Sequence, residues 1–363
     1  MSVANPSLVG TARTMPPDSF PLGDALNSFE KIGFEMTYKP DKKIEELKKK
    51  ILSNPEKASL YDELLWIYFD QASMHNDPSR IDHILACIKR FPREEICRTP
   101  FVNIDPKLSP EGFQQVEIEW KKLLSENPED PLIALGAANF YCPQNVERAK
   151  DILRKILDND SNQAEVWLHL GRYTYNPHER LDCFLTAQKK GAIQPNLLVW
   201  IASSSVEACE YQTAEEYAIK LLDLVHNARN EYGDKLDWNE KGGALFNKSL
   251  QDTGNRSKAR KLVNEISAHA YHKHWGHTVL GHVSLHKGDL QAALSHLRES
   301  GEVVSDCRLS SYGPSLTLAK KICALGKWTH VAEYLKACES FWDDERLPIW
   351  VSMVESKKMP DFQ

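Results

Sequence analysis

The chain has 363 residues, of which 42% are hydrophobic and 26% charged, the composition of a globular protein with enough apolar material for a large core. Its formal net charge of −6 argues against a general nucleic-acid binder, because such proteins carry a strongly basic surface. The sequence contains no run near the roughly 18 consecutive apolar residues that a membrane span requires, so no membrane partner is expected.

The N-terminal segment carries no recognisable targeting signal. Met1 to Asp24 lacks the basic region and the apolar region of a signal peptide. Its prolines stand among small polar residues, at Pro6, Pro16, Pro17 and Pro21. We therefore expect residues 1–40 to form a poorly ordered arm, and we expect a cytoplasmic protein.

The eight cysteines are scattered along the chain, with no Cys-x-x-Cys pair and no zinc-ribbon spacing. Most of them fall where a helix would bury a small apolar residue, and free cysteine is among the most buried residue types. This pattern indicates reduced core thiols in a reducing compartment.

Residues 41–130 show helical periodicity without a regular repeat. Apolar residues recur at intervals of three and four, as an amphipathic helix requires. Helices are expected at Ile44–Leu52, Leu60–Ala72, Arg80–Phe91 and Glu111–Glu126. The segment Arg98–Pro110 contains Pro100 and Pro106 and is expected to be an extended linker.

From residue 131 onward the pattern becomes a series of short helical hairpins. Between His277 and Leu297 two helical periods are separated by Lys287-Gly288-Asp289. Gly288 suits a left-handed helix end, and Asp289 can cap the helix after it. Similar breaks recur, and the comparable second-helix positions are Ala149, Arg180, Ala214, Ala259, Ala293 and Val331, at spacings of 31, 34, 45, 34 and 38 residues.

These hairpins resemble the tetratricopeptide-repeat family, whose unit has 34 residues. Trp167 with Leu170-Gly171 matches the first-helix motif, while Leu135-Gly136 and Leu280-Gly281 match its Leu-Gly pair. The crossing alanine of the second helix is matched at Ala149, Ala214, Ala259 and Ala293, whereas Arg180 and Val331 depart from it. The resemblance implies an all-α fold, a right-handed αα-superhelix over residues 131–340, with residues 341–363 as a capping segment.

The C-terminal part also resembles uncharacterised bacterial proteins of the tetratricopeptide-like type. The shared features are Gly276-His277-x-x-Leu280-Gly281, Ser311-Tyr312-Gly313-Pro314 and Pro360-Asp361-Phe362. This resemblance implies a bacterial cytosolic origin and carries no activity with it.

Histidine is concentrated in one stretch of the chain. Seven of the thirteen histidines lie between His269 and His296, and His282 and His286 are four residues apart on one expected helix. That spacing can present two imidazoles to one metal ion. The alternative is a set of solvated or packed histidines, which the lack of a glutamate between His269 and His296 favours.

A second set of candidate residues comes from the repeat register. The residue after each Leu-Gly pair is expected to face the concave groove, and so is the residue one turn later. This reasoning gives a binding groove of Arg172, Tyr175, Lys248, Gln251, His282, His286 and Lys320. Such a cationic stripe fits an extended anionic chain, although an ordinary solvated face is the alternative.

We therefore expect a protein-interaction scaffold that binds a protein or peptide segment, acidic in character, in the concave groove. No nucleotide-binding glycine loop, nucleophile elbow or His-Glu-x-x-His helix is present, and no cofactor is expected. The alternative is a metal-dependent or general acid/base enzyme that uses the histidine cluster 269–296, with His282 and His286 as ligands. An RNA-binding solenoid is disfavoured by the net charge of −6.

Overall fold

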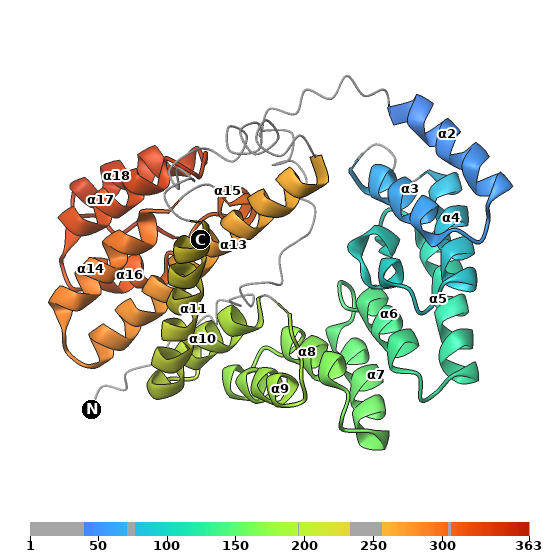
Figure 1. Ribbon diagram of the computed structural model, residues 1–363, viewed down its shortest axis with the longest axis horizontal. Coiled ribbons are helices and arrows are strands. Elements are labelled where there is room, and N and C mark those ends of the chain that lie inside the picture. Colours follow the sequence, from blue (N-terminus) through green and yellow to red (C-terminus); the bar gives the residue numbers. More distant parts are fainter. Residues whose placement is uncertain (1–39, 71–76, 195, 233–255, 304–305, 363) are drawn as a thin grey trace, which may run out of the picture.

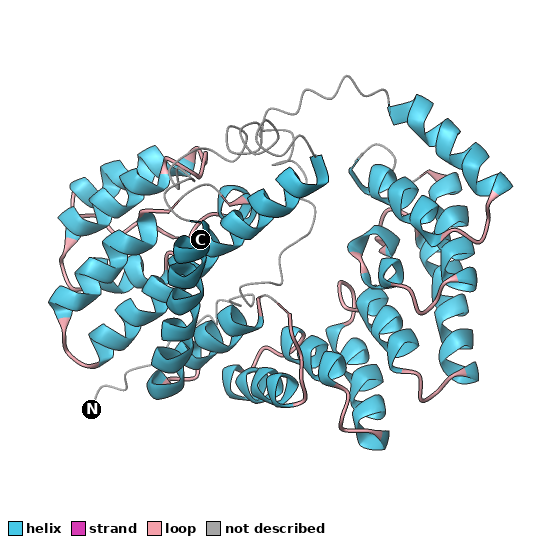
Figure 2. Cartoon of the chain, in the orientation of Figure 1, coloured by secondary structure: helices cyan, strands magenta, loops and turns pink. Residues whose placement is uncertain are grey.

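The computed structural model describes residues 40–70, 77–194, 196–232, 256–303 and 306–362. Within these ranges the secondary structure is entirely helical, with no β-strand (Figure 2). This part of the chain therefore confirms the all-α prediction. In the same ranges, every helix is too short or too polar to traverse a lipid bilayer.

The described part of the N-terminal third contains four α-helices and two short 3₁₀ turns. The helices are α2 (Pro40–Ser53), α3 (Ala58–Asp70), α4 (Pro78–Arg90) and α5 (Pro110–Glu126). The 3₁₀ turns η2 (Glu95–Arg98) and η3 (Pro100–Val102) occupy part of the segment expected to be an extended linker. Val102 and Ile104 are buried there, so this segment packs as part of the core.

The middle of the chain is a run of short helices joined by tight turns. They are α6 (Pro131–Tyr141), α7 (Val146–Asn159), α8 (Ala164–Arg172), α9 (Pro177–Lys189), α10 (Leu197–Glu207) and α11 (Tyr211–Tyr232). Side chains at the N-caps explain several starts, since Asp130, Asn145 and Asn176 each accept hydrogen bonds from backbone N–H groups in the first turn.

The C-terminal part begins with the longest of the described helices, α13 (Arg256–His286). It continues with α14 (Leu290–Gly301), α15 (Cys307–Tyr312), α16 (Thr317–Ala324), α17 (Trp328–Cys338) and α18 (Arg346–Glu355). The α13–α14 turn has the expected form, because Gly288 has φ +78° and Asp289 accepts from the backbone N–H of Ala292. Helix α18 lies within residues 341–363, the segment expected to cap the array.

The single helix α13 differs from the repeat pattern. The pattern assigns Ala259 to the end of one hairpin and Leu280-Gly281 to the start of the next, yet both lie on this one helix. The intervening sequence contains no proline and only one glycine, Gly276. A Cβ at Gly276 would come within 2.8 Å of Leu222 Cδ2, so this glycine serves close packing on α11 and does not end the helix.

Helices that are neighbours in the sequence pack against one another and trace an open arc from α2 to α18 (Figure 1). Contacts also join helices that are not neighbours in the sequence, since α6 touches α8, α10 touches α13, and α13 touches α16. The core is elongated and has two parts, and the half-buried Trp167 packs against both. At the helix crossings, Ala149, Ala214 and Ala293 are fully buried, as close approach of two helix backbones requires.

Candidate functional site

Arg172 is a predicted groove residue that contacts an aromatic side chain of the next hairpin. It ends α8, and its guanidinium carbon lies 5.5 Å from the centroid of the Trp200 ring on α10. Trp200 in turn stacks on Phe184 of α9, with ring centroids 5.6 Å apart and an interplanar angle of 26°. The stacked rings hold the guanidinium where α8 and α10, the first helices of two successive hairpins, meet.

Two donors at this junction are buried and lack an acceptor among the residues that the structure describes. They are Nε of Arg172 and Nε1 of Trp200. A buried N–H without a partner costs roughly 1–3 kcal/mol. An acceptor oxygen that reached these two donors would recover this free energy.

Two titratable side chains near Arg172 are uncharged. His169, one turn earlier on α8, is buried, and this burial, together with the charges of Arg172 and Arg98, lowers its pKa to about 3. The imidazole is therefore neutral and does not add to the charge of Arg172. Burial raises the pKa of the Cys142 thiol to about 11 despite the nearby Arg172, so this thiol does not offset the positive charge either.

The other expected groove residues fall in several environments. Tyr175 and Lys320 are exposed, and each remains available to a ligand. His286 is exposed and stacks on Tyr211 of α11, with ring centroids 3.9 Å apart. Lys248 and Gln251 lie outside the described residues, so their part of the predicted groove has no structural account.

The predicted groove position of His282 needs correction. Its side chain is only 4% exposed, and its Nε2 lies 3.0 Å from Thr317 Oγ1 of α16. Burial, with a contribution from Lys321, lowers the pKa of His282 to about 3, so the ring is neutral. Ala137 and Ser203, at the matching positions of other hairpins, are also buried. The residue after a Leu-Gly pair is therefore often a core residue here.

Most of the histidine stretch serves packing between α13 and its neighbours. His274 is fully buried and joins two segments: its Nδ1 lies 2.9 Å from the carbonyl oxygen of Ser300, and its Nε2 accepts from the backbone N–H of Ser315 at 2.9 Å. These partners require a neutral ring with the proton on Nδ1. Burial lowers the pKa of His274 to about 4, in agreement with this assignment.

The pair named as ligands in the alternative enzyme hypothesis, His282 and His286, has divergent contacts, because His282 is buried against Thr317 and His286 is stacked on Tyr211. A different trio brings ligand atoms together within the described chain. His277, His296 and Glu299 each offer one such atom, and these atoms lie within 4.8 Å of one another. The sequence contains a signal for part of this trio, since His296 and Glu299 are three apart on α14 and share a face.

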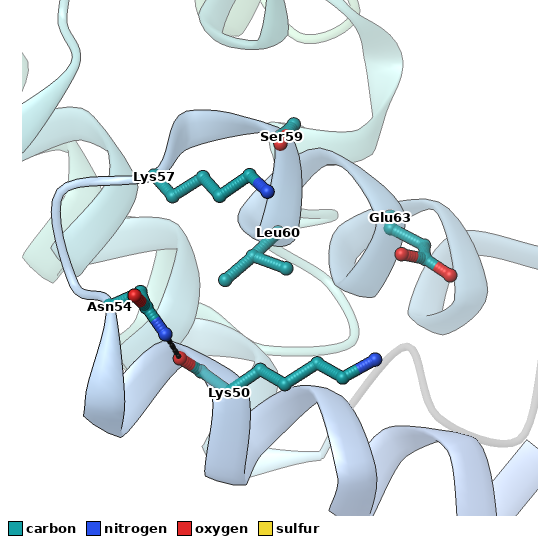
Figure 3. A pocket seen from close by; sticks show the side chains of 6 residues that line it. All are labelled: Lys50, Asn54, Lys57, Ser59, Leu60 and Glu63. Carbon is teal, nitrogen blue, oxygen red and sulfur yellow. Dashed lines mark hydrogen bonds between the residues drawn. The ribbon is translucent and has the colours of Figure 1, made fainter.

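A hollow of about 550 Å³ lies between the end of α2 and the start of α3 (Figure 3). It is lined by Lys50, Asn54, Lys57, Ser59, Leu60 and Glu63. Five of these six side chains are exposed, and only Leu60 is buried. The hollow therefore has the polar walls of ordinary surface and offers no set of fixed groups for chemistry.

Comparison with known proteins adds no relative: no family model matches the chain, and no curated protein matches it. A function for this chain is therefore inferred from the contacts, burial and charges of its own residues.

Proposed function

We propose that this chain is a tetratricopeptide-like scaffold, a right-handed αα-superhelix that binds an acidic peptide or protein segment along its first helices. The observation that carries the proposal is the Arg172–Trp200 pair, which joins α8 and α10 and holds two buried donors without acceptors among the described residues. The site belongs to two hairpins at once, as expected for a ligand that lies across the repeats.

Contacts between helices of successive hairpins support a binding face that spans several hairpins. Helices α6 and α8 touch, as do α10 and α13, and α13 and α16. Helical-repeat proteins use the surface made by such a layer of helices to hold extended partners. Lys320 on α16 is exposed and supplies a second cation toward the far end of this layer.

The chemistry of the pair favours a carboxylate-bearing chain. An arginine fork matches the geometry of a carboxylate and forms two parallel hydrogen bonds with it. The indole beside it offers an apolar face and one further donor. A peptide can satisfy both groups, with an Asp or Glu side chain at Arg172 and a backbone carbonyl at Trp200.

The seven cysteines with described side chains are all free thiols. This state supports placing the proposed function in a reducing compartment, the cytoplasm.

Selection of random peptides displayed on phage, against the full chain, tests the proposal. We expect the selected peptides to be enriched in Asp and Glu. Arg172→Glu should lower the affinity for a selected synthetic peptide by about 10–100-fold, because a hydrogen bond to a charged group contributes about 1.5–3 kcal/mol. The affinity of the parent protein should also fall as salt concentration rises.

Lys189→Glu is the matched control, since Lys189 is an exposed cation on the second helix α9. This variant should bind the same peptide as the parent does. Selection of peptides without acidic residues, or equal weakening by Lys189→Glu and Arg172→Glu, would show that the proposed surface is not the binding site.

A further inference from the structure

The α13–α14 hairpin brings together three side chains of the types that can bind a metal ion. His277 comes from α13, while His296 and Glu299 come from α14. The two helices pack along their lengths, and the spacing of three residues puts His296 and Glu299 on the same face of α14. The trio is thus fixed by helices and does not depend on a loop.

The distances within the trio suit ligands of a single ion. Nδ1 of His277 lies 3.1 Å from Nδ1 of His296, and the two rings are tilted by 34°. Two nitrogens bound to one tetrahedral zinc ion at about 2.0–2.1 Å stand roughly 3.3 Å apart. The imidazole pair is therefore close to a chelating geometry without a change of backbone.

Glu299 is the third member of the trio, since one ligand atom from each of the three residues lies within 4.8 Å of the other two. Its Oε2 lies 3.3 Å from Nε2 of His277, the ring nitrogen that does not contact His296, and its Oε1 accepts a hydrogen bond of 2.9 Å from Ser295 Oγ. The serine fixes the direction of the carboxylate in the way that outer hydrogen bonds orient metal ligands. The negative charge of Glu299 also offsets the positive charge of an incoming cation.

The trio is accessible without being fully exposed. The His277 side chain is 11% exposed and that of Glu299 is 34% exposed, so an ion can enter from the solvent side and retain water there. A nearby positive charge is Lys273, one turn before His277, and its Nζ donates to the backbone carbonyl of Glu302 at 2.5 Å. This ammonium group is thus directed to the C-terminal end of α14.

We propose that His277, His296 and Glu299 form a binding site for a divalent transition-metal ion of the zinc class. Two imidazoles and one carboxylate form a donor set that suits zinc and its first-row neighbours, whereas calcium and magnesium prefer oxygen ligands throughout. Three protein ligands leave at least one coordination position for water. The proposal is independent of peptide binding at Arg172.

Calorimetric titration of the chelator-treated full chain with Zn²⁺ tests this site. We expect one ion to bind at the trio, and His296→Ala should weaken this binding about 100-fold or more, since loss of outer partners alone costs 10–100-fold. Glu299→Gln should weaken it as well. Added Zn²⁺ should raise the Tm of the parent but not that of His296→Ala, because a ligand stabilises only the form that binds it.

His286→Ala is the matched control, because His286 is an exposed histidine on the same helix α13. It should retain the affinity and the stoichiometry of the parent. His296 is half-buried, and circular dichroism of each variant establishes that it is folded before titration. Unchanged Zn²⁺ binding in folded His296→Ala and Glu299→Gln, an absence of stoichiometric binding by the parent, or an equal loss in His286→Ala would overturn the proposal.

Discussion

Gly281 of α13 lies against Leu318 of α16 so closely that a Cβ at residue 281 would come within 2.2 Å of Leu318 Cδ2. This glycine therefore lies at a close contact between the two helices. Gly281→Leu should lower the free energy of unfolding by about 1–3 kcal/mol or more, because overpacking forces side chains or backbone to move. Urea denaturation followed by circular dichroism measures the change.

A double-mutant cycle separates this contact from general effects on α13. Leu318→Ala alone should destabilise the protein by leaving a cavity, typically by about 2–5 kcal/mol. Gly281→Ala combined with Leu318→Ala should cost clearly less than the two single changes together, because each alanine relieves the problem that the other creates. Additive free energies would mean that the two residues do not touch in solution.

Arg180 occupies a helix crossing where the repeat pattern places alanine. It is 3% exposed, and its guanidinium donates to Ser204 Oγ at 3.0 Å and to the Glu207 carboxylate, both on α10. Arg180→Ala should destabilise by about 1–3 kcal/mol, because it empties a buried volume and leaves the buried Ser204 hydroxyl without this donor. Arg180→Lys should not restore the stability, since lysine lacks the planar fork.

The control for Arg180 is Arg154→Ala. Arg154 and Asp151 form an exposed pair at 3.2 Å on α7, and exposed pairs contribute roughly 0–1 kcal/mol. Thermal and urea denaturation of the two variants should therefore differ clearly. A loss for Arg180→Ala no larger than that for Arg154→Ala would contradict a structural role at the crossing.

Local features of the sequence predict the hairpins well because they act within a few residues. Gly288 and Asp289 form the expected turn, and Gly281 of the matching Leu-Gly pair lies at a close helix contact. Features set by distant partners were not predictable in the same way. His282 is buried because Thr317 of α16 meets its ring, and Glu299 approaches His277 only because α14 folds back on α13. The tetratricopeptide assignment itself stays a prediction.

Cys209 occupies a position in one hairpin turn where comparable turns have glycine. It has φ +60°, close to the values of +78° at Gly288 and +72° at Gly326 in comparable turns. A left-handed conformation costs an L-residue about 1–2 kcal/mol, while glycine adds a smaller entropic cost in the unfolded chain. Cys209→Gly should therefore raise the free energy of unfolding by about 0.5–1 kcal/mol.

The reciprocal change tests the same principle at Gly288, where an added Cβ would meet nothing within 4 Å. Gly288→Ala should thus destabilise through the backbone alone, by about 1 kcal/mol. Urea midpoints of both variants provide the measurement. A stabilised Gly288→Ala, or a destabilised Cys209→Gly, would show that backbone conformation does not govern these turns.

Buried neutral histidines should make the protein sensitive to mild acid. In the folded state burial lowers the pKa to about 3 for His169 and His282 and to about 4 for His274, whereas an unfolded histidine titrates near 6.5. The unfolded chain therefore binds more protons below pH 6.5. The stabilising contribution of these histidines is complete above that pH and decreases as the pH falls toward the folded values.

For one such histidine the free energy of unfolding falls by about 1.4 kcal/mol between pH 7.5 and pH 5.5. His282→Gln should remove this share of the pH dependence, because glutamine is neutral throughout and its Nε2 can approach the position of the imidazole Nε2 near Thr317. Urea denaturation at both pH values gives the difference for parent and variant. His178→Gln, at an exposed position on α9, should keep the parent profile. An unchanged pH dependence in His282→Gln would mean that His282 is not buried as a neutral ring, and its place between α13 and α16 would then have to be revised.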